Sequence, residues 1–231
     1  MIFTFARTPC RHILTASYDG HVRLFDYSQN CIRDISAHPV PVSSVTVVPS
    51  PHANDDSHVI ATASHDLTAQ LTKISLAADT PAPSQTLASL HLHTSTLSSI
   101  TTDSTGSTLL TASWDTLIGV WDCTIPPEDE VPLESGDRKK RRKIGASNDT
   151  RPVRKAPSTV LKSHTARVSK ALFAPNSRQH AHSCGFDSTV RHWDVEMGVC
   201  TNTLVRSFSL NMRLVYAYLL CISRLFRSDR C

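Results

Sequence analysis

The chain has 231 residues, of which 24 are Lys or Arg and 20 are Asp or Glu, and its formal net charge is +4. Hydrophobic residues make up 40% of it and charged residues 19%, which is too apolar for a wholly disordered chain. Seven cysteines form no Cys-x-x-Cys pair, which argues against a secreted disulfide scaffold. The most apolar stretch, Leu214–Ser223, has about half of the ~20 residues that span a bilayer, so no membrane span is expected.

The positive charge is concentrated in two segments. Residues 138–155 contain nine basic residues and one acidic residue, and residues 205–231 contain five arginines and one acidic residue. The rest of the chain has 10 basic residues against 18 acidic ones, a net charge of −8. Binding to nucleic acid, which a basic protein suggests, is therefore a hypothesis about these two segments and not about the whole chain.

Taken in chain order, four segments repeat one pattern. In each of them a hydroxyl residue stands four positions before an aspartate, and a further landmark residue stands six positions after that aspartate. Apolar and polar residues alternate between aspartate and landmark, which predicts a half-buried β-strand. The segments are 15–26, 62–73, 111–122 and 183–194, with hydroxyl residues Thr15, Thr62, Thr111 and Ser183, aspartates Asp19, Asp66, Asp115 and Asp187, and landmarks Phe25, Thr72, Trp121 and Trp193.

A histidine precedes each of the last three units and is followed four residues later by an apolar segment typical of a strand. These histidines are His38, His93 and His164. The first unit is expected to lack both this strand and the histidine. The steps between successive aspartates are 47, 49 and 72 residues, and the long third step contains an insertion at 124–158.

In these residues the sequence resembles the WD-repeat β-propellers. The Trp-Asp dipeptide that gives the family its name occurs here as Trp121-Asp122 and Trp193-Asp194. The resemblance implies a hydrogen-bonded tetrad in each blade, in which Trp, hydroxyl, His and Asp satisfy one another. The third unit would use His93, Thr111, Asp115 and Trp121, and the fourth His164, Ser183, Asp187 and Trp193. The second unit keeps His38, Thr62 and Asp66, and the first keeps Thr15 and Asp19, so neither can complete the network.

An alternative interpretation of the repeated hydroxyl, His and Asp residues is a catalytic triad for nucleophilic hydrolysis. A hydrolase needs one positioned triad with an oxyanion hole, whereas a structural network needs one copy per blade. We therefore expect no enzymatic activity, no cofactor and no metal. The pairs His91/His93 and His180/His182 favour tetrad or surface roles over metal binding.

Further stretches narrow the resemblance to one family. They are ILTASYDGHVRLFD (13–26), VIATASHDLTAQL (59–71), LHLHT (90–94), LLTASWDTLIGVWD (109–122), IPPEDEVP (125–132) and RKKRRK (138–143). Over residues 10 to about 204 the sequence resembles the nucleolar WD-repeat subunits of the pescadillo complex, truncated at both ends. The resemblance implies a non-catalytic scaffold in large ribosomal subunit biogenesis, located in the nucleus, nucleolus and nucleoplasm. Implied partners are block-of-proliferation-type and pescadillo-type proteins and the pre-ribosomal particle.

The expected architecture is an all-β, partial WD-repeat propeller with about 3.5–4 of the family's seven blades. Residues 1–123 would hold the first three units, 124–158 a disordered basic insert, 159–204 the fourth unit and 205–231 an atypical tail. That tail is either a short amphipathic helix or the product of a mispredicted gene end. Such an arc cannot close into a ring, so exposed apolar surface at its ends is expected to make the chain poorly soluble or dependent on a partner.

The basic run in the insert has three interpretations. It is predicted to be a nuclear-localisation signal, it could also contact ribosomal RNA phosphates, and charge runs of this kind are otherwise solvated surface. A different class of function, a WD-type substrate receptor of a ubiquitin ligase, remains the alternative for the chain as a whole. The run consists of Arg138, Lys139, Lys140, Arg141, Arg142 and Lys143.

Overall fold

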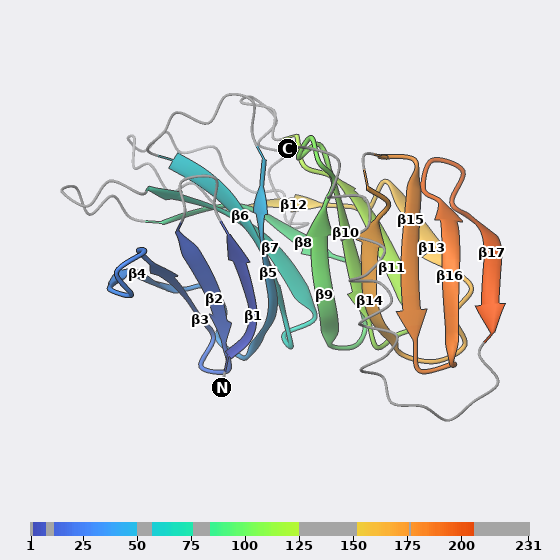
Figure 1. Ribbon diagram of the computed structural model, residues 1–231, viewed down its shortest axis with the longest axis horizontal. Helices are drawn as coiled ribbons and strands as arrows, with labels where there is room; N and C mark the ends of the chain where they lie inside the picture. Colours follow the sequence, from blue (N-terminus) through green and yellow to red (C-terminus); the bar gives the residue numbers. More distant parts are fainter. Residues whose placement is uncertain are drawn as a thin grey trace, which may run out of the picture.

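The computed structural model describes residues 2–7, 12–49, 57–75, 84–124, 152–175 and 177–205. These residues form seventeen β-strands in four sheets and no helix (Figure 1). The predicted all-β class is confirmed. No helix long and apolar enough to cross a membrane occurs within these described ranges. Each sheet is called a blade below and is numbered in chain order.

The first blade has a complete set of four strands. They follow one another in the order β1 (Ile2–Arg7), β2 (Ile13–Ser17), β3 (His21–Phe25) and β4 (Cys31–Ser36). The expectation that this unit lacks its first strand is wrong, because β1 pairs antiparallel with β2 from Ile2 opposite Ser17 to Arg7 opposite Ile13. Ladder hydrogen bonds to β2 are enough to form such a strand, and no preceding histidine is required.

The second blade carries one strand more than the others. Its own strands are β5 (Val42–Val48), β6 (Ser57–Ser64), β7 (Thr68–Ser75) and β8 (Gln85–His91), and β12 (Val153–Lys155) adds to β8 in parallel. The expectation that all of residues 124–158 are disordered is therefore wrong at Val153–Lys155, while residues 125–151 lie outside the described residues. The Lys155 ammonium group secures the short strand by donating hydrogen bonds to the carbonyl oxygens of Asp122, at 2.8 Å, and Thr124.

The third and fourth blades divide the chain differently from the sequence repeat. The third contains β9 (Leu97–Thr102), β10 (Thr108–Ser113), β11 (Leu117–Asp122) and β13 (Thr159–Lys162). The fourth contains β14 (Val168–Phe173), β15 (His180–Gly185), β16 (Thr189–Asp194) and β17 (Val199–Val205). Residues 159–204 are thus not one structural unit, because β13 pairs with β11 and the last strand extends to Val205.

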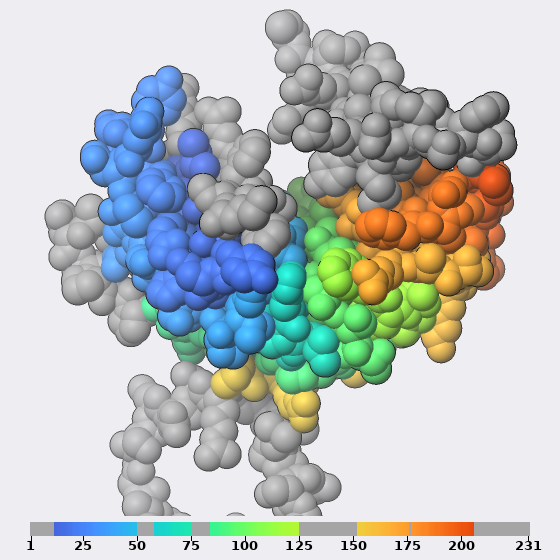
Figure 2. Space-filling view, turned by 90° about the horizontal axis from the view of Figure 1, so that it is seen from below, coloured from blue at the N-terminus to red at the C-terminus, as the bar shows by residue number. Residues whose placement is uncertain are grey.

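The four blades stand side by side in an arc. Their first strands β1, β5, β9 and β14 contact one another in succession, and the blades follow in chain order from blue to orange (Figures 1 and 2). This is the arrangement of neighbouring propeller blades. The predicted partial WD propeller is confirmed.

Apolar side chains from facing sheets hold neighbouring blades together. Leu14 and Leu24 pack with Ile60 between the first two blades, and Leu71 packs with Leu109 between the second and third. Between the third and fourth blades, Leu110 and Val120 pack against Trp193. Burial of one such side chain contributes about 1.5–3 kcal/mol, so each interface is a hydrophobic core in its own right.

Candidate functional site

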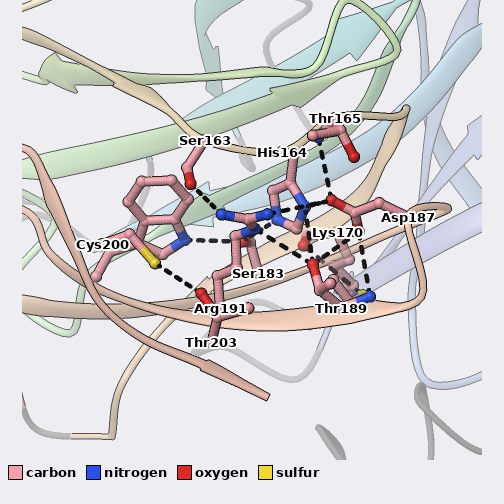
Figure 3. A network of polar contacts seen from close by, with 12 residues as sticks. Ser163, His164, Thr165, Lys170, Ser183, Asp187, Thr189, Arg191, Cys200 and Thr203 are labelled. Carbon is pink, nitrogen blue, oxygen red and sulfur yellow. Dashed lines mark hydrogen bonds and ion pairs between the residues drawn. The ribbon is translucent and has the colours of Figure 1, made fainter. Parts of the chain in front are cut away.

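A chain of four polar side chains crosses the interior of the fourth blade (Figure 3). Trp193 Nε1 lies 2.7 Å from Ser183 Oγ, Ser183 Oγ lies 2.6 Å from His164 Nε2, and His164 Nδ1 lies 2.8 Å from Asp187 Oδ2. Ser183 is fully buried and His164 nearly so. The structure therefore brings together all four residues that the resemblance assigned to this blade.

The third blade repeats the arrangement with threonine in place of serine. Trp121 Nε1 donates to Thr111 Oγ1 at 2.8 Å, and His93 bridges Thr111, at 2.8 Å, and Asp115, at 2.9 Å. Gly119 leaves room for this chain, because a Cβ atom there would lie 2.7 Å from Trp121 Nε1. A side chain at this position would push the indole away from Thr111.

The direction of every proton in these chains follows from their two ends. An indole N–H can only donate, and an ionised carboxylate can only accept. The hydroxyl accepts from the tryptophan, and its own proton goes to His Nε2, the other hydrogen-bond partner that the described residues offer it. His Nδ1–H then donates to the aspartate. Each histidine is thus neutral in the Nδ1–H tautomer, and no donor or acceptor in the chain is left unpaired.

The same aspartates also shape the turn between the second and third strands of each blade. In the fourth blade Asp187 Oδ1 accepts hydrogen bonds from the Thr189 amide at 3.1 Å and the Thr189 hydroxyl at 2.7 Å. The residue after the aspartate has a left-handed backbone, as at Thr116 (φ 75°) and Ser188 (φ 59°). Such a backbone costs a residue with a Cβ atom about 1–2 kcal/mol, which the aspartate's hydrogen bonds offset.

Hydrogen bonding decides the ionisation of these carboxyl groups. Burial by itself raises the pKa of Asp187, but hydrogen bonds from Thr189, His164 and the Thr165 amide outweigh it and lower the pKa to about 2. The pKa of Asp115 is also lowered, with hydrogen bonds from His93 and the Leu117 amide outweighing its burial. Burial lowers the pKa of His164 despite the nearby Asp187, in agreement with a neutral imidazole.

The second blade makes only part of the network. His38 lies 2.9 Å from Thr62 Oγ1 and 2.7 Å from Asp66 Oδ2, so these three predicted residues meet. Thr72 stands where the other two blades have tryptophan, and it is too short to reach Thr62. Its buried hydroxyl has no hydrogen-bond partner.

The first blade replaces the network with surface ion pairs. Asp19 accepts a hydrogen bond from Arg23 at 2.6 Å, and Arg23 Nε also contacts Asp34 at 3.3 Å. Thr15 is buried at its predicted place in β2. Thr15 and Asp19 are therefore not bridged by a histidine, as the sequence indicated.

The order Asp187–His164–Ser183 has the appearance of a hydrolytic triad, but it cannot act as one on an external substrate. The Ser183 side chain is fully buried, and its oxygen accepts a hydrogen bond from Trp193. A nucleophile must be able to reach its substrate. These networks are closed within the blade.

A row of rings on one rim of the arc escaped the sequence analysis. Each ring comes from the residue just before a repeat aspartate, and we call these residues the aromatic row: Tyr18, His65, Trp114 and Phe186. The ring centroids of Tyr18 and His65 lie 6.3 Å apart, and those of His65 and Trp114 lie 6.4 Å apart. The signal was present in TASYD, TASHD, TASWD and SCGFD, but a period of about 50 residues hides such neighbours until the blades are placed side by side.

Arg167 links Trp114 to Phe186 in this row. Its guanidinium carbon lies 4.6 Å from the Trp114 ring centroid, and its carbonyl oxygen accepts from the Phe186 amide at 2.8 Å. The amides of His65 and Trp114 are held in the same way by Pro41 and Thr96. Tyr18 is 56% exposed, Trp114 37% and Phe186 55%. The row is therefore preorganised and open to solvent.

The basic run, the tail and the pair His91/His93 remain to be placed. The basic run Arg138–Lys143 and the tail beyond residue 205 lie outside the described residues. His91 lies beside Ser89, at 2.8 Å, while His93 belongs to the third network.

Comparisons with known proteins agree with this geometry. The family model described as "WD domain, G-beta repeat" matches residues 84–122 and 155–194. A "Ribosome biogenesis protein YTM1" of Laccaria bicolor is 52% identical over 204 residues, 85% of this chain and 45% of that protein. The protein of the same name in Saccharomyces cerevisiae is 31% identical over 227 residues, 87% of this chain and 47% of that protein. A "Ribosome biogenesis protein WDR12 homolog" of Oryza sativa is 28% identical over 199 residues, 86% of this chain and 45% of that protein. The chain spans a little under half the length of these relatives.

Two threonine-to-valine substitutions should change stability in opposite directions. Thr72→Val removes a buried hydroxyl that has no partner, so the free energy of unfolding should rise by about 1 kcal/mol. Thr111→Val leaves Trp121 Nε1 and His93 Nε2 without their partner and should lower it by about 1–3 kcal/mol. Chemical denaturation of both variants measures the difference, and equal effects of the same sign would contradict the network.

Acid should destabilise the fourth blade within a defined window. The pKa of Asp187 is about 2 in the folded protein against an ordinary value of 3.8, so its contribution is complete above about pH 4 and is lost as the pH falls towards 2. Asp187→Asn should flatten the slope of unfolding free energy against pH in that window. Glu196→Gln, at an exposed position of the same blade, is the control and should leave the slope as it is.

Proposed function

We propose that this chain, a WD-repeat protein homologous to the ribosome biogenesis proteins named YTM1 and WDR12, is a non-catalytic scaffold in large ribosomal subunit biogenesis. The observation that carries the proposal is the 52% identity to one such protein over 204 residues, a stretch that covers most of the described blades. The same names disfavour the alternative of a ubiquitin-ligase substrate receptor.

The physical character of the blades supports a scaffold. Buried cores join each blade to the next, and the polar networks of the third and fourth blades hold their strands and turns in fixed positions. A surface on such a frame keeps its shape before a partner arrives. Binding to it therefore loses little conformational entropy.

The aromatic row is the proposed docking surface for protein partners. Tyrosine, tryptophan and arginine are the residues most enriched among those that dominate binding energy at interfaces. Tyr18, Trp114 and Arg167 bring all three types to one rim, where backbone hydrogen bonds already orient Trp114 and Phe186. The family resemblance supplies the partners: block-of-proliferation-type and pescadillo-type proteins within the pre-ribosomal particle.

The basic run Arg138–Lys143 is proposed to direct the chain to the nucleus and nucleolus. Six consecutive basic residues form the pattern that import receptors recognise, and the same charges could contact ribosomal RNA phosphates. RNA contact of this kind is electrostatic and should weaken steeply with added salt. Nuclear import and RNA contact by the basic run are compatible with partner docking on the blades, because neither depends on the folded surface of the blades.

Partner capture tests both the function and the surface. The tagged chain expressed in fungal cells should recover pescadillo-type and block-of-proliferation-type proteins, whereas recovery of cullin adaptors in their place would overturn the proposed function. Tyr18→Ala combined with Trp114→Ala should reduce the recovery at least several-fold. Tyr27→Ala is the matched control, because Tyr27 is 82% exposed and lies in the turn between β3 and β4, outside the aromatic row. Full recovery by the double variant would reject the aromatic row and leave the function standing.

Replacement of the six basic residues by glutamine should abolish nuclear accumulation of a fluorescent fusion. The control is a substitution that changes no lysine or arginine, Ser104→Ala in the exposed turn after β9, and it should leave the fusion nuclear. Unchanged nuclear accumulation of the glutamine variant would show that the run is ordinary solvated surface.

A further inference from the structure

The fourth blade has one sheet face turned away from the third blade. Strand alternation sends Ala181, Ser183 and Trp193 towards the third blade, where Ala181 and Trp193 join the shared core. The residues between them must point to the other side. On β15 and β16 this opposite face carries His180, His182, His192 and Asp194.

Two of these positions differ in chemistry from their equivalents in the other blades. The equivalents are aliphatic and lie in the cores that join each blade to the next. They are Leu14 and Leu24 in the first blade, Ala61 and Leu71 in the second, and Leu110 and Val120 in the third. The fourth blade has His182 and His192, so imidazoles take the place of an aliphatic pair.

The two imidazoles are directed at each other across the strands. His182 pairs with His192 in the β15–β16 register, and their Nδ1 atoms lie 3.2 Å apart. The third imidazole is close by, with the His180 ring centroid 5.3 Å from that of His192. His180 itself stands opposite Asp194 in the register. Three imidazoles and one carboxylate thus form two adjacent cross-strand pairs.

We propose that His182 and His192 form a binding site for a divalent transition metal of the kind that imidazole prefers, with Zn²⁺ as the reference ion. Tetrahedral zinc with Zn–N bonds of about 2.0–2.1 Å places neighbouring nitrogens about 3.3 Å apart, close to the separation of these two Nδ1 atoms. Imidazole nitrogen suits Zn²⁺, Cu²⁺ and Ni²⁺. No three ligand groups of the described residues surround a common point, so His180, Asp194 or water completes the coordination on binding.

The protonation state of His182 favours metal binding. Burial lowers the pKa of His182, and the neighbouring His192 and His180 lower it further, so this imidazole is neutral at pH 7. In the free protein one Nδ1–H donates to the other Nδ1. On metal binding that proton moves to Nε2 of the same ring through solvent, and both Nδ1 lone pairs reach the metal without a net release of protons.

Calorimetric titration of the untagged full chain with Zn²⁺ at pH 7 tests the site. We expect one ion per chain, together with a higher thermal midpoint in the presence of Zn²⁺. His182→Ala and His192→Ala should each weaken binding by at least about tenfold and abolish the rise in midpoint. His180→Ala should weaken it less, because that ring is not one of the 3.2 Å pair.

His91→Ala is the matched control, since His91 also lies on a strand but contacts only Ser89 among the hydrogen-bond partners the structure gives it. It should bind Zn²⁺ as the unchanged chain does. His182→Gln, which keeps a polar side chain, guards against loss of binding through unfolding and should also lose the metal while keeping the circular dichroism of the fold. Undiminished Zn²⁺ binding by His182→Ala and His192→Ala, or no saturable binding by the unchanged chain, would overturn the proposal and leave the pair as a neutral N–H···N hydrogen bond.

Discussion

The hairpin between the second and third strands of each blade depends on one carboxylate that must be supplied with hydrogen bonds. In the second, third and fourth blades the repeat aspartate accepts from a buried histidine on one oxygen and from the amide two residues further on with the other. Those bonds keep the carboxyl group ionised despite its burial. They also hold the next residue, which is Leu67, Thr116 or Ser188, in a left-handed backbone that a residue with a Cβ atom would not adopt unaided. The position of the turn therefore depends on the aspartate.

The aromatic row follows from the same constraint. A residue that directly precedes the constrained aspartate has its amide paired with the segment before the first strand of its own blade, as at Trp114 and Phe186. Its side chain is then directed towards solvent. In the third blade, for example, the exposed Trp114 stands between the buried Ser113 and the hydrogen-bonded Asp115. The same turn therefore positions both the interior network and the aromatic row. A change to the network would be expected to displace the surface as well.

The four blades satisfy this constraint by different means. The third and fourth use the full chain from tryptophan to aspartate. The second ends at Thr62, because Thr72 replaces the tryptophan and its buried hydroxyl has no partner, and the first relies on Arg23 at the surface. Exposed ion pairs contribute little, because water solvates the separated charges nearly as well. The first blade is therefore held mainly by its apolar core with the second, which contains Leu14, Leu24 and Ile60. From these differences we expect local opening to be easier in the first blade than in the fourth.

The sequence by itself determined the repeat, the strand alternation and the residues of the third and fourth polar networks, because all of these depend on short, constant spacings such as Thr111 to Asp115. It could not place Ile2–Arg7, Val153–Lys155 or Thr159–Lys162, since short strands are defined by their partners and those of β12 and β13 lie dozens of residues away. Nor could it show that Tyr18, His65 and Trp114 are neighbours, or that His182 meets His192. Only the tertiary structure decided these contacts, because side-by-side packing of the blades joins residues almost 50 positions apart, and the register of a strand pair decides which side chains of a hairpin meet.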